Sequence, residues 1–244
     1  MKFKRKKVFF LLNTLEEYNF DRYVRKYLPS SQFRILIGTE LPKDSEKYSI
    51  IIPWSYRRQI PNTKSYKNLV IFHTSDLPQG RGWSPIANLF LNETPIYTMT
   101  GFLPNSKIDD GDVVLKLNFP MKSVYTAAIL RKWDEELSII ATRILLDKFD
   151  GNELSGKEQE YSQATYFEKR NREMGELNPN NTLIEDFNLL RSAEEEHPCF
   201  IFYRGEKFRV TIEPMNSPSF PQDVRVVFPR TGEEVLLREF GIIN

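Results

Sequence analysis

Short apolar runs recur along the first third of the chain, and each is followed by a residue that ends a strand. The runs at 8–12, 33–37, 48–52 and 69–72 have the length of strands that are buried on both faces. Apolar residues between positions 20 and 28 instead recur at helical spacing, which predicts a helix packed on the sheet. Because no tight hairpin signal separates these strands, the pattern favours an α/β fold. We expect a Rossmann-like, mostly parallel sheet with helices on both faces.

Two more strands and a long helix are predicted in the middle of the chain. Residues 96–102 alternate in strand fashion, and 113–117 form the next apolar run after an acidic turn. A helix is expected to begin at Pro85, with Ser84 as its cap. From 122 to 150 the pattern is helical, with one apolar stripe.

A polar stretch at 151–159 predicts the end of the first domain. We therefore expect a catalytic domain over 1–150 and a small, β-rich extension over 151–244. The extension should hold an amphipathic helix around 183–190 and two hairpins, one within 200–212 and one within 224–237.

The charge balance argues against a nucleic-acid partner. The 34 basic and 33 acidic residues leave a formal charge of +1, so no global field would hold a polyanion. The single Cys199 excludes an internal disulfide, and with only two histidines no metal site is expected. No apolar run approaches the ~20 residues that span a bilayer, so we expect a cytoplasmic protein without a membrane partner.

The candidate chemistry begins at His73, which follows the run at 69–72 and precedes a turn-rich stretch. In open α/β sheets ligands bind at this end of the strands. A lone histidine in such a place is more often structural, so its partner matters. Asp109 and its neighbours form either a solvated turn or a carboxylate partner for His73. Asp76, three residues after His73, is a rival partner that could instead cap the turn.

Two blocks resemble signatures of the formyltransferase superfamily. Residues 73–85, HTSDLPQGRGWSP, resemble the block that carries its catalytic histidine, and residues 164–170, ATYFEKR, resemble the segment after its catalytic domain. The turn Asp109-Asp110-Gly111 matches the Asp-x-Gly turn of the family's catalytic aspartate. The Gly-Trp-Ser-Pro variant and the short chain look most like sugar N-formyltransferases, which are related to methionyl-tRNA formyltransferase.

The resemblance implies transfer of a formyl group from 10-formyltetrahydrofolate to the amine of a nucleotide-linked amino sugar. A dTDP- or GDP-4-amino-4,6-dideoxyhexose, used for surface polysaccharide such as O-antigen, is an example, and a homodimer is expected. The resemblance makes His73 the catalytic base and Asp109 its partner. Cofactor contacts are expected from Trp54, Tyr56, Ile60 and Asp109. Substrate contacts are expected from Gly82, Trp83, Tyr166, Lys169 and Arg81, whose guanidinium suits a diphosphate.

One departure from the family pattern opens an alternative. Ile71 stands two residues before His73, where the family usually has an asparagine that is thought to hold the formyl oxygen. Asn88, Asn92 and a backbone amide near Ser75 are the candidate replacements. Otherwise the chain is a non-catalytic relative that binds nucleotide sugar or folate without turning it over.

Overall fold

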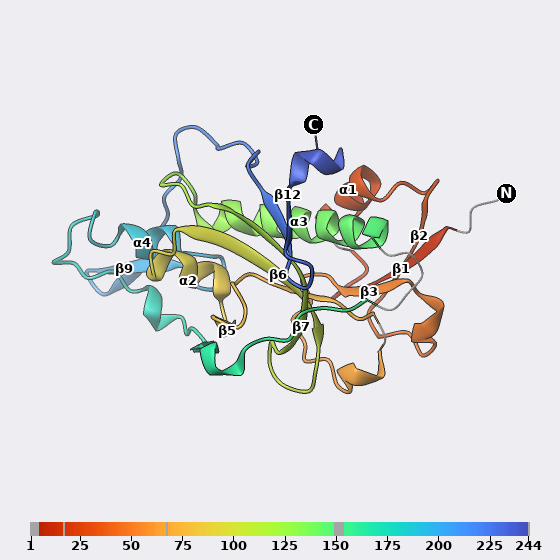
Figure 1. Ribbon diagram of the computed structural model, residues 1–244. Coiled ribbons are helices and arrows are strands. Elements are labelled where there is room, and N and C mark those ends of the chain that lie inside the picture. The colour runs from red at the N-terminus through yellow and green to blue at the C-terminus, as the bar shows by residue number, and fades with distance from the viewer. Residues whose placement is uncertain (1–4, 17, 67, 149–153, 244) are drawn as a thin grey trace.

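The parallel part of the sheet forms where the apolar runs predict it. The computed structural model describes residues 5–16, 18–66, 68–148 and 154–243. In it β1 (Lys6–Leu11) lies between β2 (Phe33–Gly38) and β3 (Ile50–Pro53), and both pairings are parallel (Figure 1). A parallel bridge from Ile51 to Leu69 joins β3 to the chain that enters β4 (Ile71–His73). The carboxyl ends of these strands therefore share one edge.

The sheet continues beyond β4 with antiparallel strands. Its order is β12 (Glu233–Leu236), β11 (Arg225–Phe228), β7 (Gly111–Pro120), β6 (Ile96–Pro104) and β4. A short turn joins β6 to β7, and a connection of that length allows only antiparallel pairing. The predicted α/β class with a parallel sheet is confirmed, although parallel pairing covers a smaller part of the sheet than expected.

The two faces of the parallel strands are covered differently. Val8 and Phe10 face the main core, where α1 (Tyr18–Tyr27) and α3 (Ala127–Lys148) pack on the sheet (Figure 1). Phe9 and Leu11 point the other way, into a smaller cluster with Ile51 and Leu69. Loops and two 3-10 turns, Ser45–Lys47 and Thr63–Ser65, cover that second face where a helix was expected. The segments between β2, β3 and β4 are polar and lack a helical apolar stripe.

The remaining elements lie at one end of the sheet. They are β5 (Arg81–Gly82), α2 (Pro85–Leu91), β8 (Tyr166–Phe167), α4 (Phe187–Arg191), β9 (Cys199–Tyr203) and β10 (Glu206–Val210), with 3-10 turns at Tyr161–Gln163 and Glu173–Gly175. A last 3-10 turn, Leu237–Phe240, follows β12 and packs in the main core. The β9–β10 hairpin is confirmed. α2 begins at Pro85 as predicted, but Ser84 has a left-handed backbone (φ 50°) and makes no side-chain cap. α4 is shorter than predicted, since Leu183 and Ile184 precede it and are exposed.

The last hairpin pairs with a strand of the first 150 residues. The expected boundary between residues 150 and 151 lies outside the described residues. The β11–β12 hairpin forms as predicted, but β11 pairs with β7, so it completes the sheet that also contains β4. Among the described residues, no helix has the length and apolar character needed to cross a membrane.

Candidate functional site

His73 ends β4 at the carboxyl edge of the parallel strands. The turn begins at once, because the Ser75 amide donates to the His73 carbonyl oxygen at 3.0 Å. The ring Nε2 lies 2.8 Å from the carbonyl oxygen of Gly80. Since a carbonyl only accepts, Nε2 carries the hydrogen and the neutral ring keeps a lone pair on Nδ1. The side chain retains 10% exposure, so a small molecule can reach it.

Asp109 approaches His73 from the turn between β6 and β7. Its Oδ2 lies 3.8 Å from the His73 Nδ1 and accepts the Gly82 amide hydrogen at 2.8 Å. Asp109 has a left-handed backbone (φ 47°). Gly111 follows with φ 138°, where an added Cβ would lie 1.9 Å from the Leu103 carbonyl oxygen. The turn therefore needs glycine here, and it brings the two predicted catalytic side chains together.

Arg81 is completely buried directly behind this pair. Its Nη2 donates to Asp110 Oδ1 at 2.7 Å, its Nε and Nη2 donate to Gln159 Oε1 at 3.2 and 2.7 Å, and its Nη1 donates to the Tyr166 hydroxyl at 3.2 Å. This guanidinium supports the site from inside and has no exposed surface for a diphosphate, which differs from the sequence expectation.

The Asp110 carboxylate is held in its charged form. Burial alone would raise the pKa of Asp110. The side-chain hydrogen bond from Asn105, the charge of Arg81 and the Gly111 amide outweigh that effect and lower the pKa below its ordinary value of 3.8. The Arg81–Asp110 contact is therefore a true ion pair at neutral pH.

The two blocks that carry the family resemblance lie side by side. β5, from the first block, pairs in parallel with β8, from the second. The Arg81 amide donates to the Thr165 carbonyl oxygen at 3.0 Å, and the Gly80 amide donates to Thr165 Oγ1 at 2.9 Å. The Gly80 carbonyl that accepts the His73 hydrogen is thus fixed by a residue far along the chain.

Three exposed aromatic side chains surround the β5–β8 pair, and we call them the aromatic rim: Trp83, Tyr161 and Tyr166. Their exposed fractions are 52%, 63% and 54%. Lys169 places its Nζ 4.7 Å from the centre of the Trp83 ring, and Lys107 places its Nζ 4.6 Å from that of Tyr161. Rings and cations next to each other can bind planar, negatively charged molecules.

The expected cofactor residues do not gather in one place. Trp54 is 2% exposed, donates its indole hydrogen to the Glu135 carbonyl oxygen at 3.2 Å and meets Phe20 edge-on. It belongs to the core under α3 and is not the wall of an open pocket. Tyr56 and Ile60 are partly exposed and pack on the opposite face of the parallel strands. Alternation along a strand could not tell which side Trp54 takes after the strand ends.

The candidate replacements for the missing asparagine are engaged or remote. Ile71 lies on β4, and its side chain has no hydrogen-bond donor. Asn88 donates its amide hydrogens to carbonyls at the start of its own helix, and Asn92 is exposed at the end of that helix. The Ser75 amide is used by the His73 carbonyl, and its Oγ is buried without a hydrogen-bond partner among the described residues.

Asp76, the rival partner of His73, faces another residue. It forms an ion pair with Lys116 of β7, whose ammonium also donates to the Leu77 carbonyl oxygen at 2.7 Å. The turn after His73 is thereby tied to the neighbouring part of the sheet. Within the described ranges, no three His, Cys, Asp or Glu side chains gather as ligands for a metal ion.

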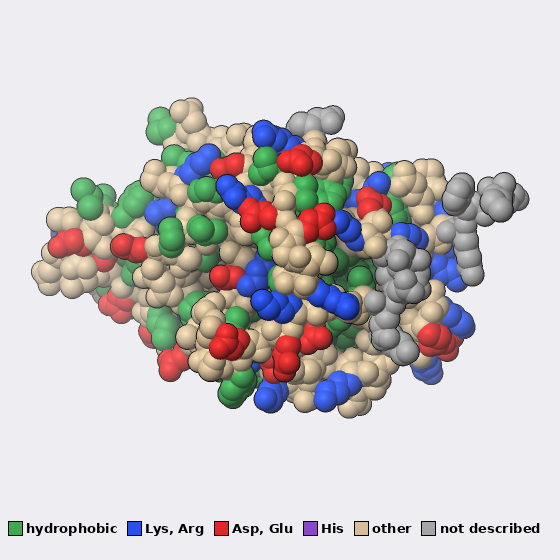
Figure 2. Space-filling model, viewed as in Figure 1, with side chains coloured by type: hydrophobic (Ala, Val, Ile, Leu, Met, Phe, Trp, Pro, Cys, Tyr) green, Lys and Arg blue, Asp and Glu red, His purple; other side chains and the backbone are tan. Residues whose placement is uncertain are grey.

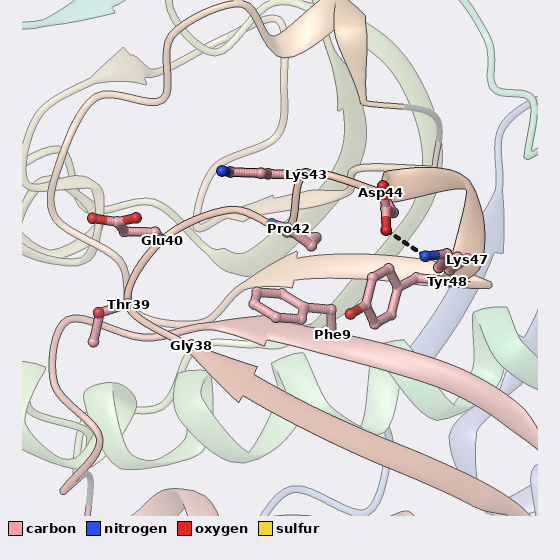
Figure 3. A pocket seen from close by; sticks show the side chains of 9 residues that line it. All are labelled: Phe9, Gly38, Thr39, Glu40, Pro42, Lys43, Asp44, Lys47 and Tyr48. Carbon is pink, nitrogen blue, oxygen red and sulfur yellow. Dashed lines mark hydrogen bonds and ion pairs between the residues drawn. The ribbon is translucent and has the colours of Figure 1, made fainter.

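A separate hollow of about 530 Å³ opens at the carboxyl end of β2 (Figure 3). Phe9 and Tyr48 lie at its base, with the Lys47–Asp44 ion pair beside them. The lining residues are Phe9, Gly38, Thr39, Glu40, Pro42, Lys43, Asp44, Lys47 and Tyr48. None of them is a predicted site residue, and β1 and β3 separate this strand from β4.

Comparison with known sequences gives distant relatives of one kind. No family model matches the chain. The methionyl-tRNA formyltransferase of Acetivibrio thermocellus is 27% identical over 143 residues, which are 57% of this chain and 45% of that protein. The chain spans about half the length of the curated relatives it matches.

Comparison with solved structures identifies the fold. Methionyl-tRNA formyltransferase from Clostridium thermocellum superposes with a TM-score of 0.68 at 20% identity, covering 91% of this chain and 99% of that one. This chain has the formyltransferase fold. A sugar N-formyltransferase from Shewanella sp FDAARGOS_354 gives a TM-score of 0.63 at 15% identity, covering 87% and 99%. HypX from Aquifex aeolicus, solved in complex with tetrahydrofolic acid, gives 0.67 at 16% identity, covering 86% and 38%.

Sequence reasoning missed the residues that hold the site of this formyltransferase fold together. Gln159 bonds to Arg81 and to the Asp109 turn, yet it lies in the polar stretch assigned to the domain boundary. Thr165 belongs to the second block but had no assigned role. Neither side chain stands out in a local pattern, since both act through contacts made across long loops.

Proposed function

We propose that this protein is an N-formyltransferase that moves a formyl group from 10-formyltetrahydrofolate to the amine of a nucleotide-linked amino sugar. The observation that carries the proposal is the His73–Asp109 pair at the carboxyl edge of the sheet, with 3.8 Å between Nδ1 and Oδ2. Two solved structures of the same fold support this proposal, one named as a sugar N-formyltransferase and the other as a likely one. The balanced surface also favours a small acceptor, since basic and acidic side chains are interspersed over the visible face (Figure 2).

Proton transfer is the chemistry that this pair can perform. When the acceptor amine attacks the formyl carbon, its nitrogen must lose a proton, and Nδ1 of His73 has the lone pair to take it. The resulting imidazolium donates from Nε2 to the Gly80 carbonyl and directs its Nδ1 hydrogen toward Asp109. The carboxylate stabilises that charge, as in other histidine–aspartate pairs. Asp109 keeps its place through the Gly82 amide.

The residues at the sheet edge fit a formyl donor in part. When bound, 10-formyltetrahydrofolate supplies the formyl carbon, and the nitrogen that carried it leaves with a proton. His73 and Asp109 are partly exposed, so they can take part in this proton transfer. The expected cofactor contacts fit less well, because Trp54 is buried in the core. Tyr56 and Ile60 remain the proposed contacts for the flat ring.

The aromatic rim is the proposed site of the nucleotide. Stacking on Trp83 or Tyr166 would hold the base, and Lys169 would lie beside the diphosphate as a cation. The Gly82 amide already donates to Asp109, so Gly82 would line this site without offering its amide hydrogen to the ligand.

A non-catalytic binding protein is the second candidate, and Ile71 favours it. Loss of one designed donor to an oxyanion commonly costs about 3–4 kcal/mol in the transition state. With Asn88 and the Ser75 amide engaged, that cost is uncompensated unless the ligand brings its own donor or the turn shifts on binding. Such a protein would bind folate and nucleotide sugar and release both unchanged.

The deciding experiment offers the protein a panel of thymidine-, guanosine- and uridine-diphospho amino sugars together with 10-formyltetrahydrofolate. Mass spectrometry should find one sugar that gains a single formyl unit. Calorimetric titration with the same ligands runs in parallel. Binding without any formylated product would support the non-catalytic alternative, and neither binding nor product would contradict both.

Substitution of Trp83 by alanine is expected to raise the KM for the nucleotide sugar about 10-fold and to leave kcat nearly unchanged. The reason is that stacking on one aromatic side chain contributes ~1–3 kcal/mol per base, and the base is remote from the reacting amine. Steady-state kinetics at saturating 10-formyltetrahydrofolate measure both constants. Tyr203→Ala is the matched control, because that ring is 58% exposed on the distant strand β9. An unchanged KM in Trp83→Ala would show that Trp83 does not bind the nucleotide.

A further inference from the structure

Gln159 makes hydrogen bonds to two structures that support the proposed catalytic pair, the buried Arg81 and the Asp109 turn. Its Oε1 accepts two hydrogens from the buried Arg81, and its Nε2 donates to the carbonyl oxygens of Asp109 and Gly111 at 3.2 and 2.9 Å. The side chain is 8% exposed. The amide oxygen and the amide nitrogen of Gln159 thus each have two partners. Because the oxygen can only accept and the nitrogen can only donate, these partners allow one orientation of the amide.

The segment that carries Gln159 is fixed to the sheet and to the His73 turn. Val113 of β7 and Lys157 exchange two backbone hydrogen bonds, at 2.8 and 2.9 Å. Gly156 fits closely there, since an added Cβ would lie 2.6 Å from the Val113 carbonyl oxygen. At its other end the segment reaches Thr165, which accepts the Gly80 amide hydrogen. Residues 156–167 therefore span both turns that form the site.

The Asp109 turn needs such a support. A left-handed backbone at a residue other than glycine costs free energy, and it persists only where surrounding contacts fix it. The carbonyls of Asp109 and Gly111 both point at the Gln159 amide. Arg81 holds Asp110 between them. The direction of the Asp109 carboxylate toward Gly82 and His73 follows from this backbone.

We propose that Gln159 is a positioning residue, which fixes the Asp109 turn so that the carboxylate stays beside His73. The expected effect on kcat rests on the proposed formyl transfer. The expected effect on the Asp109 turn does not. Gln159 is buried and its hydrogen bonds go to Arg81, Asp109 and Gly111, so we expect it to act on His73 through the Asp109 turn and Arg81.

The test uses Gln159→Leu in the whole chain of 244 residues, with two readouts. In the first, hydrogen exchange of the Gly82 amide, followed by NMR, reports its bond to Asp109 Oδ2. Exchange at Gly82 should become at least about 10-fold faster, while the Gly232 amide, which donates to Phe228 in the far hairpin, should not change. In the second, kcat should fall by up to about 10²-fold with KM within about twofold, because misplacement of a catalytic group affects the chemical step.

Two further variants complete the design. Gln163→Leu is the matched control, since that exposed glutamine of the same segment donates its side-chain hydrogen to Glu160, and it should leave both readouts unchanged. Gln159→Glu keeps an acceptor for Arg81 but loses both donated bonds, so it serves if the leucine variant does not fold, and it should also deprotect Gly82.

The exchange measurement separates the two proposals. Wild-type-like protection of Gly82 in both Gln159 variants would overturn the positioning role, whatever the kinetics show. If the wild-type protein formylates no sugar, the proposed function fails, and Gly82 exchange still decides the role of Gln159. Faster exchange at Gly82 with the kcat of wild type would also overturn the positioning role, because Asp109 would then be free to move without consequence.

Discussion

Substitution of His73 by asparagine is expected to lower kcat for formyl transfer by about 10²–10⁴-fold, the range that a positioned proton acceptor contributes. The asparagine side chain has no basic nitrogen, so the amine proton has no acceptor at this position. Binding of the nucleotide sugar should be largely intact, because the aromatic rim is untouched. Formylated product is measured by mass spectrometry and binding by calorimetry.

The chain provides its own control for this substitution. His197 is the second of two histidines, and its Nε2 lies 3.2 Å from the Arg170 carbonyl oxygen, away from the sheet edge. His197→Asn should keep wild-type turnover. If His73→Asn turns over as fast as the wild type, the assignment of His73 as the base is refuted.

Substitution of Asp110 by alanine is expected to destabilise the fold by about 3–5 kcal/mol, the usual cost of leaving one member of a buried ion pair without its partner. Arg81 has no exposed surface on which water could replace the carboxylate. The free energy of unfolding is measured by urea denaturation. The exposed pair Arg225–Glu234 is the matched control, and Glu234→Gln should cost at most about 1 kcal/mol.

The same ion pair gives the stability a pH dependence. The pKa of Asp110 is lower in the folded protein than its ordinary value of 3.8, so its charged form favours the folded state. That contribution is complete above the ordinary pKa and is lost as the pH falls through the lowered one. Asp110→Asn should therefore lose less stability than the wild type between neutral and acidic pH. Equal losses in both proteins would show that the pair contributes nothing measurable.

The sequence was sufficient for features that depend on local patterns. The apolar run before His73 ends in a strand at that residue, and both C-terminal hairpins form where turn residues interrupt β-branched and aromatic runs. The meeting of His73 with Asp109 follows the expectation that came from the family resemblance, and the structure adds its distance and hydrogen bonds.

Features that depend on long-range contacts were beyond sequence patterns. Arg81 reads as a surface cation next to glycines, but Gln159, from a different loop, and Asp110 make its burial possible. Trp54 follows a strand that buries residues on both faces, so its side could not be assigned. The polar stretch before Ala164 reads as a linker because the hydrogen-bond partners of the Leu154 and Lys157 backbone lie dozens of positions earlier, on Asn68 and Val113.

The pairing of β11 with β7 has a consequence for how this chain can be divided. A chain truncated after α3 would retain β7 but expose a row of backbone amides and carbonyls that β11 normally covers. Such an uncovered border recruits strands from other molecules and promotes aggregation. The β11–β12 hairpin thus protects the edge of β7. Chimeras based on this scaffold should keep this hairpin even when the segment between α3 and β11 is exchanged.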